Sequence, residues 1–188
     1  MSFLWFIIAG LILLIPTGYA AWIGAPYAPT RLRAPRRAFD LLRIGPGDTL
    51  ADLGVGDGSI ILEAAKRGAT AYGYELSPIM YAVAKLRALG KKAHVRFGNF
   101  YKQTYRDATV IFAFLMPDNM HKAEHLIRTG TSPKLEYVLA YAFPFKNVTP
   151  MQVVREKNCA PLYVYEAKEF RPNPSSPPPD KGDRGGWA

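Results

Sequence analysis

Two aspartates and three glycines share one short stretch, Asp52-x-Gly54-x-Gly56-Asp57-Gly58, between an apolar run and a helical pattern. Glycines in a turn after a strand let the backbone approach a bound nucleotide-like ligand closely. The dinucleotide pattern G-x-G-x-x-G has its third glycine one residue later and receives a pyrophosphate at a helix N-terminus. Here Asp57 would repel a phosphate, and Asp52 adds a second negative charge. The loop therefore favours a ligand that has a cationic portion and no phosphate.

A third carboxylate follows the next apolar run, in the sequence YGYELSP. Glu75 lies 21 residues after Gly54, at the end of a predicted strand, where a carboxylate can accept both hydroxyls of a ribose. Leu76 follows it and is expected to line the same site. The loop and Glu75 together predict S-adenosylmethionine, which carries a sulfonium, an ammonium group and a ribose. The alternative is a glycine-rich turn without a ligand.

The third predicted strand ends in FGNF, and its last two residues are candidates for contacting an adenine. In doubly wound α/β folds that bind S-adenosylmethionine, the end of the third strand lies beside the adenine base. We expect the Asn99 amide at the base edge and the Phe100 ring at its face. The alternative is that Asn99 is a turn residue and Phe100 a core aromatic.

Alternating strand and helix patterns must position these residues. Continuous apolar runs predict five strands, and the last segment predicts a hairpin of two more: 49–55, 70–76, 93–100, 109–115, 135–145 and 151–170. Helical spacing predicts helices at 33–45, 58–68, 77–90 and 117–130. Because the strands are apolar throughout, we expect a sheet covered on both faces. The predicted fold is α/β, a doubly wound, mostly parallel, seven-strand Rossmann-like sheet with an antiparallel edge hairpin.

The two ends of the chain differ in composition from the domain between them. Residues 1–25 contain no charged side chain, and the first basic residue, Arg31, begins a cluster of five arginines that ends at Arg43. A stretch of roughly 20 apolar residues spans a bilayer, and the positive-inside rule places the arginines on the cytoplasmic side. We therefore predict a single-pass transmembrane anchor at 1–25, a domain at 26–170 on the cytoplasmic side or in an equivalent organelle compartment, and a disordered tail at 171–188. The alternative for 1–25 is a buried helix.

Several segments together resemble one known family. They are PYAPT at 26–30, the stretch from LADLGVGDG to ELSP at 50–78, FGNF at 97–100, VIFAFLMPDNM at 110–120, and AFPF at 142–145 followed by Pro150. This combination resembles the small membrane-anchored class I lysine methyltransferases that include the mitochondrial enzymes acting on the ATP synthase c-subunit and the adenine nucleotide translocase. The resemblance implies an S-adenosylmethionine-dependent protein-lysine N-methyltransferase, acting on a membrane protein with an accessible lysine, with the lipid bilayer as a further partner.

A lysine that accepts a methyl group must be neutral, although its free pKa is about 10.4. An apolar, aromatic-lined channel lowers that pKa because it disfavours the charged form. Candidate walls of such a channel follow the fourth and fifth strands: Phe114, Met116, Pro117, Phe143 and Phe145. Tyr27 and Thr30 carry hydroxyls that could bind the cofactor or orient the amine, and Tyr27 is the candidate catalytic residue. The alternative is that PYAPT only turns the chain into the domain.

Some features of the sequence are also compatible with other functions. The net charge of +9 invites a nucleic-acid substrate. However, the position after the fourth strand reads FLMPDN and lacks the [DNS]-P-P-[YFW] tetrapeptide of many amino-methylating nucleic-acid enzymes, so no nucleic-acid partner is expected. The alternatives that stay open are a lipid or quinone methyltransferase, a nucleic-acid methyltransferase and a non-catalytic S-adenosylmethionine-binding module. The pattern HKAEH at 121–125 has zinc-peptidase spacing, but no third ligand is defined and no metal is expected.

Overall fold

A seven-stranded sheet forms the centre of the computed structural model, which describes residues 2–23 and 29–171. The strand order is β3-β2-β1-β4-β5-β7-β6. The first five strands of this order pair in parallel, whereas β7 pairs antiparallel with both β5 and β6. The strands are β1 (Thr49–Leu53), β2 (Thr70–Glu75), β3 (Ala93–Phe97), β4 (Val110–Ala113), β5 (Tyr137–Tyr141), β6 (Gln152–Val154) and β7 (Leu162–Glu166). The predicted α/β sheet and its antiparallel edge are confirmed.

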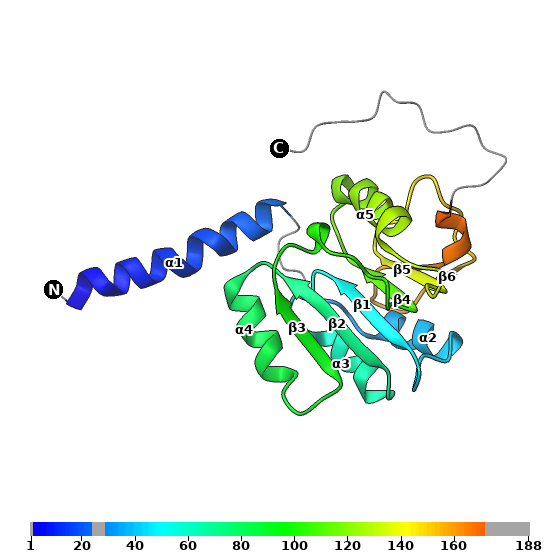
Figure 1. Cartoon of the computed structure of the whole chain (residues 1–188), viewed down its shortest axis with the longest axis horizontal. Coiled ribbons are helices and arrows are strands. Elements are labelled where there is room, and N and C mark those ends of the chain that lie inside the picture. The colour runs from blue at the N-terminus through cyan, green and yellow to red at the C-terminus, as the bar shows by residue number, and fades with distance from the viewer. Residues whose placement is uncertain (1, 24–28, 172–188) are drawn as a thin grey trace, which may run out of the picture.

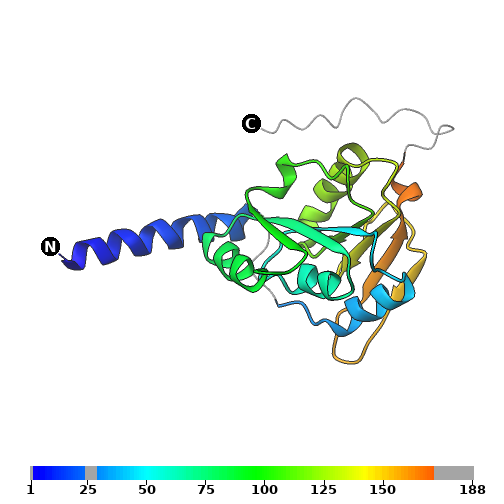
Figure 2. The same cartoon turned by 60° about the horizontal axis from the view of Figure 1, so that its bottom comes forward.

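Helices cover the sheet on both faces (Figures 1 and 2). One layer consists of α2 (Arg33–Leu41), α3 (Ser59–Lys66) and α4 (Pro78–Arg87). The other consists of α5 (Pro117–Gly130) with the short helices η1 (Phe100–Lys102) and η2 (Ala167–Phe170). Two separate apolar clusters fill the spaces between the sheet and these layers. This double covering is why the strands are apolar throughout instead of alternating.

The central strands fix where the loops of the site begin. In β1, the side chains of Leu50 and Leu53 are completely buried, as is Ile111 in the neighbouring β4. The parallel register aligns Asp52 with Gly73 of β2 and with Phe112 of β4. The carboxyl ends of these parallel strands therefore lie at one edge of the sheet, which is where ligands bind in doubly wound folds.

Helix α1 (Ser2–Ile23) extends away from the domain (Figures 1 and 2). Large apolar side chains between Phe3 and Ile15 are exposed, with Phe3, Trp5 and Phe6 each more than two thirds accessible to solvent. Within residues 2–23 and 29–171, however, no helix is long and apolar enough to cross a membrane. The predicted transmembrane anchor is therefore not supported. The predicted tail lies outside the described residues apart from Arg171, whose guanidinium donates a 3.1 Å hydrogen bond to the Pro133 carbonyl.

Candidate cofactor-binding site

The glycine loop adopts a backbone that ordinary side chains disfavour. Gly54, Gly56 and Gly58 have φ angles of 88°, 55° and 84°, which lie in the region that glycine enters without a steric penalty. A Cβ on Gly58 would also lie 3.4 Å from the Cβ of Ala84 in α4. The loop is thus packed against α4 from behind, and its backbone is free to face a ligand at the edge of the sheet.

Glu75 holds the loop from the end of β2. One of its carboxylate oxygens accepts a 2.8 Å hydrogen bond from the Gly56 amide, and the other accepts a 2.8 Å bond from the Ser77 amide. Burial raises the pKa of Glu75, and hydrogen bonds from Ser77, Gly56 and Leu76 oppose that rise. The carboxylate therefore joins the glycine loop to the start of α4, and it retains lone pairs for a further donor such as a ribose hydroxyl.

Asp52 is a buried carboxylate surrounded by negative charge. Its side chain lies at the end of β1, and the residue is only 3% exposed. Burial raises the pKa of Asp52 well above its usual value, and the charges of Glu75 and Asp57 raise it further. A cation beside these three carboxylates would relieve their repulsion and favour their ionised forms. The residues present therefore fit S-adenosylmethionine, whose positively charged sulfonium and ammonium groups suit an acidic site.

Asp57 is already engaged within the protein. Its carboxylate accepts hydrogen bonds from the Ser59 amide (3.1 Å) and hydroxyl (2.7 Å), and it forms an ion pair with Arg87 of α4. Burial acts to raise the pKa of Asp57, but the bonds from Ser59 and Arg87 prevail and lower it. Asp57 therefore accepts a bond from the first amide of α3 and links the loop to α4. Its direct contact with a cofactor, expected from the sequence, stays a prediction.

Asn99 and Phe100, which follow β3, have structural roles as a turn residue and a core aromatic, and they also border the glycine loop. The Asn99 side-chain oxygen accepts a 2.9 Å bond from the Tyr101 amide and so caps η1. Phe100 is 7% exposed, and its ring lies 3.9 Å from the position of a Cβ on Gly54. Leu76, next to Glu75, is half-buried. Phe100 therefore lies next to Gly54 at the start of the glycine loop, and its contact with an adenine stays a prediction.

The N-terminal part of the domain lies beside the end of β5. Tyr27 lies outside the described residues, and Thr30 is half-buried. The guanidinium of Arg31 donates a 2.5 Å hydrogen bond to the carbonyl of Asn158, in the loop between β6 and β7. Burial raises the pKa of Tyr141 at the end of β5, and the backbones of Ala160 and Arg31 are among the groups close enough to affect it. The segment that contains Thr30 is thus held near this edge of the sheet.

The predicted channel residues divide between two parts of the domain. The Phe114 ring meets Tyr141 edge-on with centroids 4.9 Å apart, and both pack with the core cluster below α2–α4. Met116 and Pro117, at the start of α5, are exposed. Phe143 and Phe145 pack with the opposite cluster, where Phe145 is 2% exposed and lies against Tyr165. Phe114 and Phe145 therefore do not form one wall, because they belong to different sides of the sheet.

Three residues missed by the sequence reasoning shape this edge of the sheet. Arg87 binds both the carboxylate and the carbonyl of Asp57, but no spacing pattern links positions 30 residues apart. Ala142, after β5, has a φ of 71°, an uncommon conformation for a residue with a side chain. Gly73 allows β2 to approach β1, since a Cβ there would lie 2.5 Å from the Cγ2 of Val55. Only Gly73 carried a signal, because glycine inside a strand indicates a close approach.

The histidine pair of α5 does not assemble a metal site. His121 and His125 are both exposed, and the buried Glu124 between them forms a 2.8 Å ion pair with Arg128. Across residues 2–23 and 29–171, no group of three or more histidine, cysteine, aspartate or glutamate residues is placed to hold a metal ion.

A mostly parallel sheet with this strand order, a glycine loop after β1 and a carboxylate at the end of β2 defines a Rossmann-like methyltransferase domain, for which S-adenosylmethionine is the cofactor. The chain belongs to the family described as the ANTKMT methyltransferase domain, whose model matches residues 52–152.

Relatives in this family are named as lysine methyltransferases. The human ATP synthase c-subunit lysine N-methyltransferase is 31% identical over 150 residues, and the match covers 78% of this chain and 63% of that protein. A frog protein of the same name, from Xenopus laevis, is 30% identical with 78% and 65% coverage. A protein-lysine N-methyltransferase from Saccharolobus islandicus is 30% identical with 69% and 84% coverage. The chain therefore spans less than two thirds of the length of the two vertebrate relatives.

Solved structures share the fold. An RNA methyltransferase from Salinibacter ruber, crystallised with S-adenosyl-L-homocysteine, has a TM-score of 0.69, 24% identity, and coverage of 81% of this chain and 98% of that one. A putative methyltransferase from Escherichia coli has a TM-score of 0.59, 18% identity, and coverage of 74% and 86%. At these identities the comparison establishes the fold and does not indicate the substrate.

Proposed function

We propose that this protein is an S-adenosylmethionine-dependent protein-lysine N-methyltransferase. The observation that carries the proposal is the glycine loop held by Glu75 at the carboxyl end of the sheet, in a domain whose relatives in vertebrates and an archaeon are named for lysine methylation. Lysine is favoured over nucleic acid because the solved RNA methyltransferase shares only the fold, whereas the sequence relatives include lysine methyltransferases at 30–31% identity.

The residues of the site mainly position the two reactants. The cofactor supplies a methyl group on a positively charged sulfur, and methyl transfer is an in-line displacement at the methyl carbon. We propose that Glu75 binds the ribose, that Asp52 receives the ammonium group, and that Asn99 and Phe100 border the adenine. Holding both reactants in line supplies a large part of the rate enhancement in such reactions.

The lysine must reach the site as a neutral amine. We propose that Phe114 and Tyr141, which meet edge-on at the carboxyl ends of β4 and β5, form part of the wall that excludes water. Burial among aromatic side chains disfavours the ammonium form and lowers the pKa of the lysine. Tyr27 and Thr30 precede Arg31, which is held at this edge by Asn158, and we propose that their hydroxyls orient the amine or the cofactor.

The direct test is to find which molecule receives the methyl group. Incubation of the purified protein with a membrane extract and S-adenosylmethionine labelled in its methyl group should yield methyl-lysine in a protein digest by mass spectrometry. The variant Glu75→Ala in the same extract is the control and should give little label. Label confined to RNA or lipid, without methyl-lysine, would show that the proposal is wrong.

The exposed apolar side chains of α1 suggest where the enzyme works. We propose that α1 attaches the protein to a membrane and that the substrate is a membrane protein. Large apolar side chains exposed between Phe3 and Ile15 are unfavourable in water and mark a contact surface. Attachment to the same membrane would raise the effective concentration of a membrane-bound substrate without a new contact.

Removal of α1 tests this attachment. A variant that lacks residues 2–24 should move from the membrane fraction to the soluble fraction in cell lysates, whereas the complete chain should stay with membranes through a carbonate wash. Binding of S-adenosyl-L-homocysteine to the shortened protein, measured by calorimetry, shows that its domain is folded. If the carbonate wash releases the complete chain from membranes as fully as the shortened protein, α1 does not attach the protein to the membrane.

A further inference from the structure

Helix α4 exposes large apolar side chains to solvent beside its charged ones. Among the residues of α4, all of which the structure describes, only Ala84 is buried. Ile79 and Val83 are 39% and 40% exposed, Leu86 is 70% exposed, and Leu89, just after the end of α4, is 65% exposed. A surface helix ordinarily places its apolar stripe toward the core and its polar face outward. The outward stripe of α4 therefore indicates a surface that is covered in use.

Basic residues lie at one end of this stripe. Residues 76–95, which contain α4 and the turn before β3, include four lysines or arginines and no aspartate or glutamate, and of the four Arg87 is paired with Asp57. Lys85 lies in the last turn of α4, and Lys91 and Lys92 follow in the turn before β3; all three are exposed. On β3, the neighbouring Phe97 is 55% exposed and packs edge-on against Tyr81 with ring centroids 5.5 Å apart. The surface is therefore both apolar and basic.

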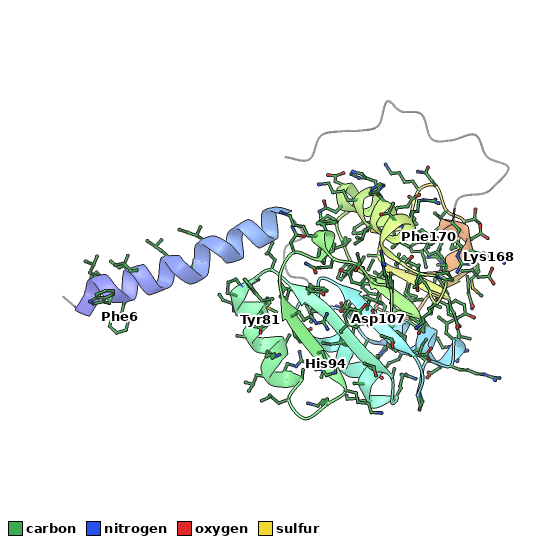
Figure 3. The ribbon with its side chains drawn as sticks, viewed as in Figure 1. Phe6, Tyr81, His94, Asp107, Lys168 and Phe170 are labelled. Carbon is green, nitrogen blue, oxygen red and sulfur yellow. The ribbon has the colours of Figure 1, made fainter. Side chains whose placement is uncertain are left out.

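The position of α1 indicates which side of the domain would face a membrane. Helix α1 contacts α4 and leaves the domain on the side where α4 and β3 lie (Figures 1 and 2). Tyr81 and His94 on this edge lie on the same side of the domain as Phe6 of α1 (Figure 3). A membrane that receives α1 would thus meet the domain first at α4.

We propose that the outer face of α4, with the basic turn at Lys91 and Lys92, binds the surface of an anionic lipid bilayer. Aliphatic side chains beside lysines suit an interface of acyl chains and acidic headgroups. A nucleic acid would match the charge but would leave Leu86 and Leu89 uncovered. The inference extends the proposed membrane attachment and adds a second, charge-dependent contact that α1, which has no charged side chain, does not provide.

This contact would act on the cofactor site through α4. The Ser77 amide at the start of α4 bonds to Glu75, and Arg87 in its last turn bonds to Asp57. Both ends of the docked helix are therefore joined to the residues that hold the glycine loop. A bilayer seated on α4 would fix the orientation of the site relative to the membrane.

The test compares the binding of the complete chain to two kinds of vesicle, phosphatidylcholine alone and phosphatidylcholine mixed with phosphatidylglycerol. The native protein should bind the mixed vesicles more tightly. Lys91→Gln and Lys92→Gln should each weaken that binding about fivefold, the effect expected for one basic residue at an anionic surface. The double variant Leu86→Gln, Leu89→Gln should weaken it by about tenfold. The matched control Lys134→Gln, Lys146→Gln removes two exposed lysines outside residues 76–95. Its affinity for the mixed vesicles should fall less than that of the Lys91 and Lys92 variants.

Amide hydrogen exchange locates the contact within the same molecules. Mixed vesicles should slow exchange in residues 78–90, while α5 exchanges at the same rate with or without them. Equal binding to both vesicle types with unchanged exchange in α4 would overturn this inference but leave the attachment by α1 intact. Binding to mixed vesicles alone would support α4 and contradict α1. The inference would be overturned if the protein self-associates and the leucine variants abolish that self-association. It would also be overturned if RNA competes with the mixed vesicles for this surface.

Discussion

Glu75→Ala is expected to weaken the binding of S-adenosyl-L-homocysteine by about 1.5–3 kcal/mol, roughly 10- to 150-fold. The variant loses the acceptor proposed for the ribose. It also leaves the amides of Gly56 and Ser77 without their 2.8 Å partners, so the glycine loop should become less well ordered. Calorimetry of the folded variant measures the loss of affinity directly.

The pH dependence of binding gives a second measurement of the same group. Burial raises the pKa of Glu75, so the carboxylate takes up a proton at a higher pH than an exposed glutamate does. Because the ionised form is the better acceptor, the native affinity should fall as the pH is lowered toward this raised pKa. Glu75→Gln keeps one acceptor oxygen but cannot ionise, so it should bind with intermediate affinity and with less pH dependence. An unchanged affinity in Glu75→Ala would show that the ribose lies elsewhere.

Gly73→Ala is expected to destabilise the fold by about 1–3 kcal/mol, as for other overpacked cores. A Cβ at this position would lie 2.5 Å from the Cγ2 of Val55 and would also overlap the carbonyl oxygen of Asp52. Since one of these neighbours is backbone, the overlap cannot be relieved by a side-chain rotation alone. The end of β1 must move, and the affinity for the cofactor should fall together with the free energy of unfolding.

Gly45→Ala is the matched control for this substitution. A Cβ on Gly45 would meet the carbonyl oxygens of Arg67 and Arg43 at 3.6 and 3.7 Å, which are ordinary contact distances. Urea unfolding and calorimetry of both variants should therefore separate a local overlap from the general effect of replacing a glycine. If Gly73→Ala is as stable as Gly45→Ala and binds the cofactor normally, the close approach of β1 and β2 is not essential to the site.

Local sequence patterns determined the elements and the cofactor loop. Continuous apolar runs identified the strands because both faces of the sheet are covered, and Ser77 before Pro78 marked the start of α4, where the Ser77 hydroxyl accepts a bond from the Met80 amide. The loop at residues 52–58 and Glu75 could be related from the sequence because each lies at the carboxyl end of a parallel strand. The carboxyl ends of such strands always lie at one edge.

Contacts between distant segments were decided only by the tertiary structure. The sequence placed Asp57 in the site but could not show that Arg87 pairs with it, because no local rule links a loop to the end of another helix. The sequence predicted that Phe145 and Phe114 line one channel, but the two rings pack on opposite faces of the sheet. The position of a residue in a loop after a strand does not show on which face its side chain packs. The outward apolar face of α4 was likewise hidden, since helical spacing shows that a stripe exists but not whether it packs inward. Which surface is buried depends on how all the elements pack together, and that is a property of the whole fold.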